Sequence, residues 1–135
     1  MTYEEGVDVI LSVFKDVWDT TGYPVQWDDH SSDVPDATTP WARATVQHDS
    51  SGQSSLANAN GAKLFANTGS LFVQIFTPIG GGLVEARQLA QKVVNQFSRV
   101  NSPVSFFRPR MRESGKSGAF QMTLVIVDFD YTDVR

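Results

Sequence analysis

Residues 71–76, Leu-Phe-Val-Gln-Ile-Phe, form one of the two apolar runs that decide the fold. The other is Met-Thr-Leu-Val-Ile-Val at residues 122–127. Both runs are rich in β-branched and aromatic side chains and contain almost no helix signal. Strands that are buried on both faces have this nearly continuous apolar character. We therefore predict that these two segments are central strands of a sheet.

Three further segments are predicted as strands. Residues 41–46 and 104–108 alternate apolar and polar side chains, which is typical of a strand with one face toward solvent. Residues 23–27 indicate a short additional strand.

A first helix is predicted near the N-terminus. Thr2 and Glu5 have the spacing of a capping box, in which two side chains satisfy free backbone amides at a helix start. Gly22 and Pro24 end the helix. Between these signals, apolar residues recur at the spacing of one helix face: Val7, Ile10, Leu11, Phe14 and Trp18.

A second helix is predicted after the three glycines at residues 80–82, and Pro103 prevents its continuation. Its apolar face consists of Ala86, Leu89, Ala90, Val93 and Phe97. A glycine-rich loop before a helix can bind phosphate, but this one lacks the Lys-Ser/Thr of a Walker motif and does not match Gly-x-Gly-x-x-Gly. We interpret the glycines as a strand-to-helix turn.

The order of these elements indicates the fold class. Strands outnumber helices, and several strands follow one another without a helical crossover, which favours α+β over a doubly wound parallel sheet. A chain of 135 residues is long enough for one domain. We therefore predict one domain over residues 1–135, with a four- to five-stranded, mainly antiparallel or mixed sheet and two helices packed on one face.

Three polar stretches are predicted as loops: residues 28–40, 49–61 and 113–118. They contain too few large apolar side chains to offset the entropy lost on ordering, about 1–2 kcal/mol per residue for the backbone. Loops this long in a small domain are usually functional or flexible.

The composition, 41% hydrophobic and 19% charged, is that of a globular protein. The absence of cysteine excludes disulfides, thiolate nucleophiles and cysteine-ligated zinc. No apolar run approaches the roughly 18–20 residues of a membrane span, and the acidic N-terminus is unlike a signal peptide. We expect a protein that folds in a cytoplasm without a membrane partner.

Charge is divided along the chain. Residues 1–50 carry ten acids and two bases, whereas residues 51–135 carry nine bases and five acids. If residues 106–112 form a strand, three arginines project on one side as a cationic row, with a lysine in the turn that follows. The members of this basic run are Arg108, Arg110, Arg112 and Lys116.

The basic run has two possible partners, DNA phosphates or the carboxylates of another protein subunit. A pI near 5.0 is unlike that of a free-standing nucleic-acid binder, which favours carboxylates. The candidate acidic partners lie in the first polar loop: Asp28, Asp29, Asp33 and Asp36.

Catalytic patterns are scarce. Asp28, Asp29 and His30 together are able to bind a divalent metal, but in a polar loop a solvated cluster is the favoured interpretation. Asp128, Asp130 and the nearby Asp133 alternate at the end of the last predicted strand, where we expect them to line a solvated sheet edge rather than to act as an acid–base pair. The sequence therefore predicts no enzyme, no cofactor and no metal site.

The order of features resembles the small tail-terminator-like proteins of long-tailed bacteriophages. The resemblance covers nearly the whole chain and rests on an acidic capped helix followed by several segments: residues 23–27, 40–43, 69–82, 106–108, 115–118 and 128–131.

This resemblance implies a structural protein that assembles as a ring, with a hexamer expected. Such a ring caps the head-proximal end of the tail tube, stops its polymerisation and joins the head–tail connector protein. DNA passes through it without specific binding. The protein is then a virion tail component that is assembled in the host cytoplasm. Two alternatives stay open: a head-completion or connector protein of similar shape, and a metal-dependent hydrolase that uses Asp28, Asp29 and His30.

Overall fold

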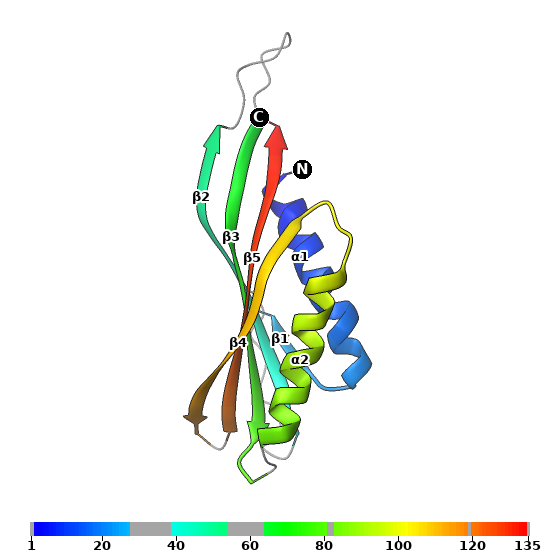
Figure 1. The fold of residues 1–135 in the computed structure, drawn as a ribbon, viewed down its shortest axis with the longest axis vertical. Coiled ribbons are helices and arrows are strands. Elements are labelled where there is room, and N and C mark those ends of the chain that lie inside the picture. Colours follow the sequence, from blue (N-terminus) through cyan, green and yellow to red (C-terminus); the bar gives the residue numbers. More distant parts are fainter. Residues whose placement is uncertain (1, 28–38, 54–63, 81–82, 119, 135) are drawn as a thin grey trace.

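The structure, a computed structural model, describes residues 2–27, 39–53, 64–80, 83–118 and 120–134. Figure 1 shows a long, twisted sheet with both helices along one of its faces. The elements in chain order are α1 (Tyr3–Trp18), the 3₁₀ turn η1 (Asp19–Thr21), β1 (Val25–Trp27), β2 (Trp41–Gln53), β3 (Leu64–Pro78), α2 (Leu83–Arg99), β4 (Ser105–Ser117) and β5 (Phe120–Val134).

The five strands form one mixed sheet in the order β1-β2-β3-β5-β4. β1 runs parallel to β2, and the other neighbours are antiparallel. The two runs predicted as central strands lie side by side in β3 and β5, with Phe72 opposite Ile126. The α+β class, the mixed sheet and the two helices are thus confirmed.

The main core lies between the helices and the sheet. Alternate residues of β3 and β5 point toward the helices because successive side chains of a strand face opposite ways. The apolar stripes of α1 and α2 cover them. Fully buried members of this core include Ile10, Phe14, Leu71, Val73, Ile75, Ala90, Val93, Val125, Val127 and Phe129.

Both ends of α1 follow from its sequence. The Thr2 hydroxyl accepts a hydrogen bond from the Glu5 backbone amide at 3.2 Å, as the capping spacing predicts. After η1, Gly22 takes a left-handed φ of 73°, which stops the helical backbone. Nearby, the Trp18 indole donates to the Pro24 carbonyl at 3.1 Å and thereby fixes the chain as it enters β1.

The strands are longer than predicted. β2 continues to Gln53 and β4 to Ser117, into stretches expected to be loops. The physical reason is antiparallel pairing, since Ser51 faces Asn67 and Lys116 faces Gln121, so backbone hydrogen bonds hold polar segments in the sheet. Residues 28–38 and 54–63, from the first two predicted loops, lie outside the described residues.

Trp18→Ala removes the largest fully buried side chain of the core and its hydrogen bond to Pro24. We expect a loss of roughly 3–5 kcal/mol in the free energy of unfolding, because a cavity replaces an aromatic ring. Urea denaturation followed by circular dichroism measures this loss. Val84→Ala is the control: this side chain is 64% exposed, and its truncation should change stability by less than about 0.5 kcal/mol.

Gly69→Ala tests the close approach of β2 to β3. A Cβ at Gly69 would overlap the carbonyl oxygen of Gln47 and lie 2.8 Å from the Phe129 ring. The strands must separate to accept it, so we expect a loss of about 1–3 kcal/mol in thermal or chemical unfolding. Gln47→Ala keeps the carbonyl and should behave like wild type; equal stability of the Gly69→Ala variant would contradict the close approach.

Candidate interaction surface

β4 is an edge strand, and its pairing with β5 is interrupted twice. Register shifts occur between Phe107 and Arg110 and between Glu113 and Gly115. At the first shift Arg108 takes a left-handed φ of 51°, an uncommon conformation for a residue with a Cβ, and Pro109 has no backbone N–H. Such bulges bend and twist a strand and redirect its side chains.

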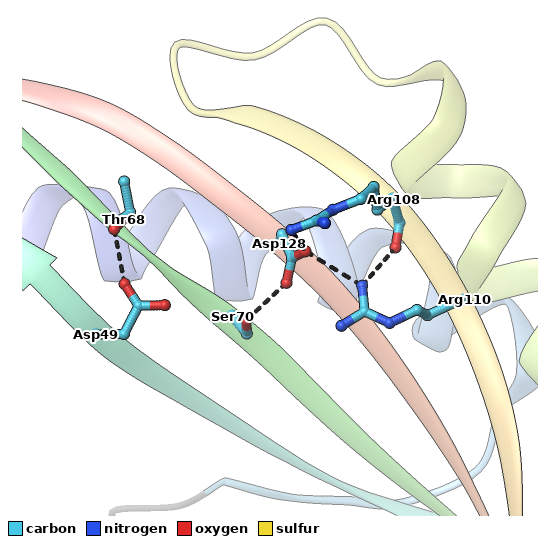
Figure 2. Close-up of polar contacts among 6 residues, drawn as sticks. All are labelled: Asp49, Thr68, Ser70, Arg108, Arg110 and Asp128. Atoms are coloured by element: carbon cyan, nitrogen blue, oxygen red, sulfur yellow. Dashed lines mark hydrogen bonds and ion pairs between the residues drawn. The ribbon is translucent and has the colours of Figure 1, made fainter.

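The first bulge brings two arginines to one carboxylate (Figure 2). Arg108 Nη2 lies 2.6 Å and Arg110 Nη1 lies 3.2 Å from Asp128 Oδ2. The Ser70 hydroxyl donates to the other Asp128 oxygen at 2.7 Å, and Arg110 also donates to the Arg108 carbonyl at 3.0 Å. We call Ser70, Asp128, Arg108 and Arg110 the Asp128 clasp. It ties three neighbouring strands together through side chains.

The clasp bears on two sequence expectations. Arg110 and Arg112 lie on one face of the sheet, opposite Ile126 and Leu124, but Arg108 and Arg110 both reach a carboxylate of their own chain. The solvated edge expected at Asp128 is wrong: β5 lies between β3 and β4, and Asp128 is only 7% exposed.

The clasp sets the charge state of Asp128. Burial raises the pKa of this carboxyl, but the hydrogen bonds from Ser70 and Arg110 and the charges of Arg110 and Arg108 lower it by more, so the net pKa lies below its ordinary value. Asp128 is therefore ionised at neutral pH. It is held as an ion-pair partner and has no proton to donate.

Beyond the clasp, β4 exposes cationic and apolar side chains together. Arg112 and Lys116 are exposed, and no ion pair reaches either of them from the described residues. Phe107 and Met111 are more than one-third exposed, which is unusual for large apolar side chains. We call these four residues the β4 patch. They follow the edge of the sheet from both sides: Phe107 and Arg112 lie opposite Asp128 and Leu124 on the face away from the helices, and Met111 and Lys116 lie opposite Val125 and Gln121 on the helix side. Arginine, methionine and aromatic residues are enriched at protein–protein interfaces.

The carboxylates that the sequence analysis proposed as partners of the basic run are not among the described residues. Asp28, Asp29, Asp33 and Asp36 all lie outside the described residues, as does His30 of the metal-site alternative. In the part of the chain that the structure describes, no group of three or more His, Asp, Glu or Cys side chains is arranged to hold a metal ion. Likewise, none of the described helices has the length and apolar character needed to span a membrane.

The described acids instead gather on α1. Five carboxylates lie exposed on this helix and the turn that follows it: Glu4, Glu5, Asp8, Asp16 and Asp19. The sequence analysis counted them as part of an acidic segment but did not identify them as a surface. Their placement opposite the apolar stripe was the available signal, since that side of an amphipathic helix faces away from the core.

The sheet face opposite the helices carries a second, smaller apolar cluster. Trp41 stacks on Phe76 with ring centroids 4.2 Å apart, and Phe120 meets Trp41 edge-on at 5.9 Å. The Arg43 guanidinium lies 5.5 Å from the Trp41 ring centroid. Farther along the same face is a shallow hollow of about 250 Å³ lined by Thr45, Gln47, Phe72, Gln74 and Leu124. This lining holds no acid–base pair and no nucleophile with a base.

His48, the described histidine, has a packing role. Its Nε2 lies 2.7 Å from the Tyr131 hydroxyl oxygen. The centroid of its ring lies 4.1 Å from the ring centroid of Tyr3, at the start of α1. Burial lowers the pKa of His48, and the nearby Asp49 charge raises it by less, so the neutral ring is favoured. These contacts hold the N-terminus of α1 against β2 and β5.

Asp128→Asn tests the clasp. We expect a loss of about 1 kcal/mol in the free energy of unfolding at pH 7, since both arginines are substantially exposed and water screens their attraction to the carboxylate. The pKa of Asp128 is lower in the folded state, so its contribution is complete above the ordinary value of 3.8 and is lost as the pH falls through the folded value. Urea unfolding at several pH values should show the two proteins converging in acid.

Asp130→Asn is the matched control. It removes a carboxylate from the same strand that is not bonded to Arg108 or Arg110. A loss at pH 7 as large as that of Asp128→Asn, or a difference from wild type that persists in acid, would contradict the stabilising role of the clasp.

Comparison with known proteins identifies the family. Residues 8–103, which extend from α1 past the end of α2, match the family model described as phage tail terminator protein. No curated protein matches the sequence. One solved structure aligns with 95% of this chain and 94% of its own, with a TM-score of 0.55. At 22% identity this likeness shows the fold alone.

The family match covers well over half of the chain and includes most of α1, the whole of α2 and three of the five strands. The family consists of structural proteins of bacteriophage tails, so a virion tail component is the role that it supports. We conclude that this chain belongs to the phage tail terminator family.

Proposed function

We propose that the protein is a tail terminator that assembles as a ring, with six copies expected, on the head-proximal end of the tail tube. The ring stops tube polymerisation and presents a surface to the head–tail connector protein. The family match over residues 8–103 is the observation that carries this proposal. The protein acts by binding and not by catalysis, and it is assembled in the host cytoplasm without a cofactor.

The shape of the protein supports such a role. The β4–β5 turn and the start of α2 lie at one end of the long axis, and the N-terminal end of α1 lies toward the other (Figure 1). Near the first end, Ile79 and Val84 are 48% and 64% exposed. A ring subunit that meets a tube on one side and a connector on the other needs two chemically different ends.

The charge distribution supports self-assembly. A closed ring of identical subunits requires two different patches that complement each other, because each copy contacts its neighbours in a head-to-tail manner. The exposed cations Arg112 and Lys116 give the β4 edge positive charge on both of its faces. The carboxylates of Asp28, Asp29, Asp33 and Asp36 remain the proposed partners from the sequence, and α1 provides further acids.

Passage of DNA through the ring fits the net charge of the protein, which is −4. Tight DNA binding requires many phosphate contacts. In the described part of the chain, Arg108 and Arg110 are already paired with Asp128. A ring of subunits with net negative charge allows DNA to pass without holding it.

The two alternative functions are less well supported. A head-completion or connector protein would share a structural role in the virion, but the family match is to tail terminators. The hydrolase alternative depends on Asp28, Asp29 and His30, which lie outside the described residues, and the family is structural.

Tube capping is tested with the purified full chain and assembling tail tubes of the same virus. We expect tubes that stop growing once the protein is added, with a ring at one end in electron micrographs. An antibody label at the head-proximal tip separates this role from head completion, which would place the label on heads. Tubes that grow at the same rate and carry no label at either end would contradict the proposal.

A further inference from the structure

The acids of the N-terminal half of the sequence and the bases of the C-terminal half lie on different sides of the folded molecule. The described residues of the N-terminal half, through β2, carry six acids and two bases. Those of α2 and β4 carry seven bases and two acids. β2 and β4 lie on opposite sides of the central β3–β5 pair, and α2 packs against β4 while α1 contacts β2. One lateral side is therefore acidic and the other basic.

The acidic side is the outward face of α1. Its exposed carboxylates, from Glu4 to Asp19, extend along the whole helix, which spans about 24 Å at 1.5 Å per residue. Lys15 is the one base of this helix, and it pairs with Asp19 at 3.5 Å. Tyr3, which is 52% exposed, adds an aromatic ring at the N-terminal end.

The basic side is the β4 patch of Phe107, Met111, Arg112 and Lys116. Because of the two bulges these residues lie opposite residues 121–128 of β5, a length of about 23 Å at 3.3 Å per strand residue, which is comparable to that of α1. The Asp128 clasp lies on the same face as Phe107 and Arg112 and pairs Arg108 and Arg110, so Arg112 and Lys116 are left for a partner. The patch thus combines exposed apolar area with exposed positive charge.

We propose that the β4 patch of one copy docks against the acidic outward side of α1 of a second copy. The inference rests on the proposed ring and names its subunit interface. Since the two surfaces lie on opposite sides of the subunit, the contact is heterologous, and successive copies continue in one direction until the ring closes. Complementary charge orients the encounter, and Phe107 and Met111 supply apolar burial.

Two features favour this side-chain contact over other uses of the edge strand. Pro109 and the two bulges interrupt the outer edge of β4, which disfavours addition of another strand by backbone hydrogen bonds. The protein has a net charge of −4, whereas nucleic-acid binders are usually basic. An acidic protein surface is therefore the partner chemistry that fits, and a second copy provides one.

The unmodified protein allows a direct test, because Lys116 is the one lysine in the β4 sequence. A carbodiimide joins an amine to a carboxylate only when the two are in ion-pair contact. Rings formed from an equal mixture of ¹⁵N-labelled and unlabelled protein are treated, digested and analysed by mass spectrometry. We expect mixed-isotope peptides that link Lys116 to one of the acids of this side: Glu4, Glu5, Asp8, Asp16 or Asp19. Rings whose mixed-isotope links join Lys116 only to other segments, or do not include Lys116, would overturn the inference.

The second test removes the two patch charges in Arg112→Gln/Lys116→Gln. Both side chains are exposed and lie outside the clasp, so folding by circular dichroism should be unchanged. We expect self-association, measured by sedimentation, to weaken roughly tenfold or more. The control Gln47→Glu/Asn101→Glu reaches the same net charge at exposed positions outside both surfaces and should associate like wild type.

The outcomes separate this interface from the proposed function. If tubes are capped by rings while Arg112→Gln/Lys116→Gln associates like wild type, the interface is wrong and the terminator role stands. If that variant associates normally but loses binding to labelled duplex DNA, the patch meets nucleic acid and the inference is overturned. A chain that stays monomeric alone and on tubes would overturn both.

Discussion

The structure depends on the pairing of β3 with β5. These strands are 15 residues long and remain in register along their entire length, from Leu64 opposite Val134 to Pro78 opposite Phe120. Their apolar centres lie side by side, so one face of the pair buries Leu71, Val73, Ile75 and their β5 neighbours beneath both helices. The other strands attach to this pair on either side, and the location of every exposed surface follows from it.

A sheet built in this way gives the molecule edges and faces for contact. The edge strand β4 is neither flat nor continuous: two bulges and Pro109 interrupt its pairing, and Asp128 holds Arg108 and Arg110 against the sheet. Such an edge resists indiscriminate strand addition and still presents side chains to a specific partner. This combination suits a family of structural tail proteins, whose function is assembly.

Much of the fold was predictable from the sequence because its signals are local. The Thr2–Glu5 cap, the stripe that includes Phe14 and Trp18, and the apolar run at 71–76 each specify an element through neighbours a few residues away. Strand lengths were not predictable in the same way. The polar residues 49–53 and 113–117 are held in strands by partners more than ten residues away or across a tight turn, and composition alone favours a loop there.

The candidate surface shows the same difference between features that local sequence determines and features that depend on tertiary structure. By itself the sequence determined the element order, the α+β class, the resemblance to tail terminators and the presence of one acidic and one basic segment. Only the tertiary structure decided that Arg108 and Arg110 pair with Asp128, that Arg112 and Lys116 remain exposed, and that acids and bases lie on opposite sides. The reason is physical: periodicity and capping act within one helical turn or strand, whereas a bulge, an ion pair and the side of a sheet depend on segments that folding alone brings together.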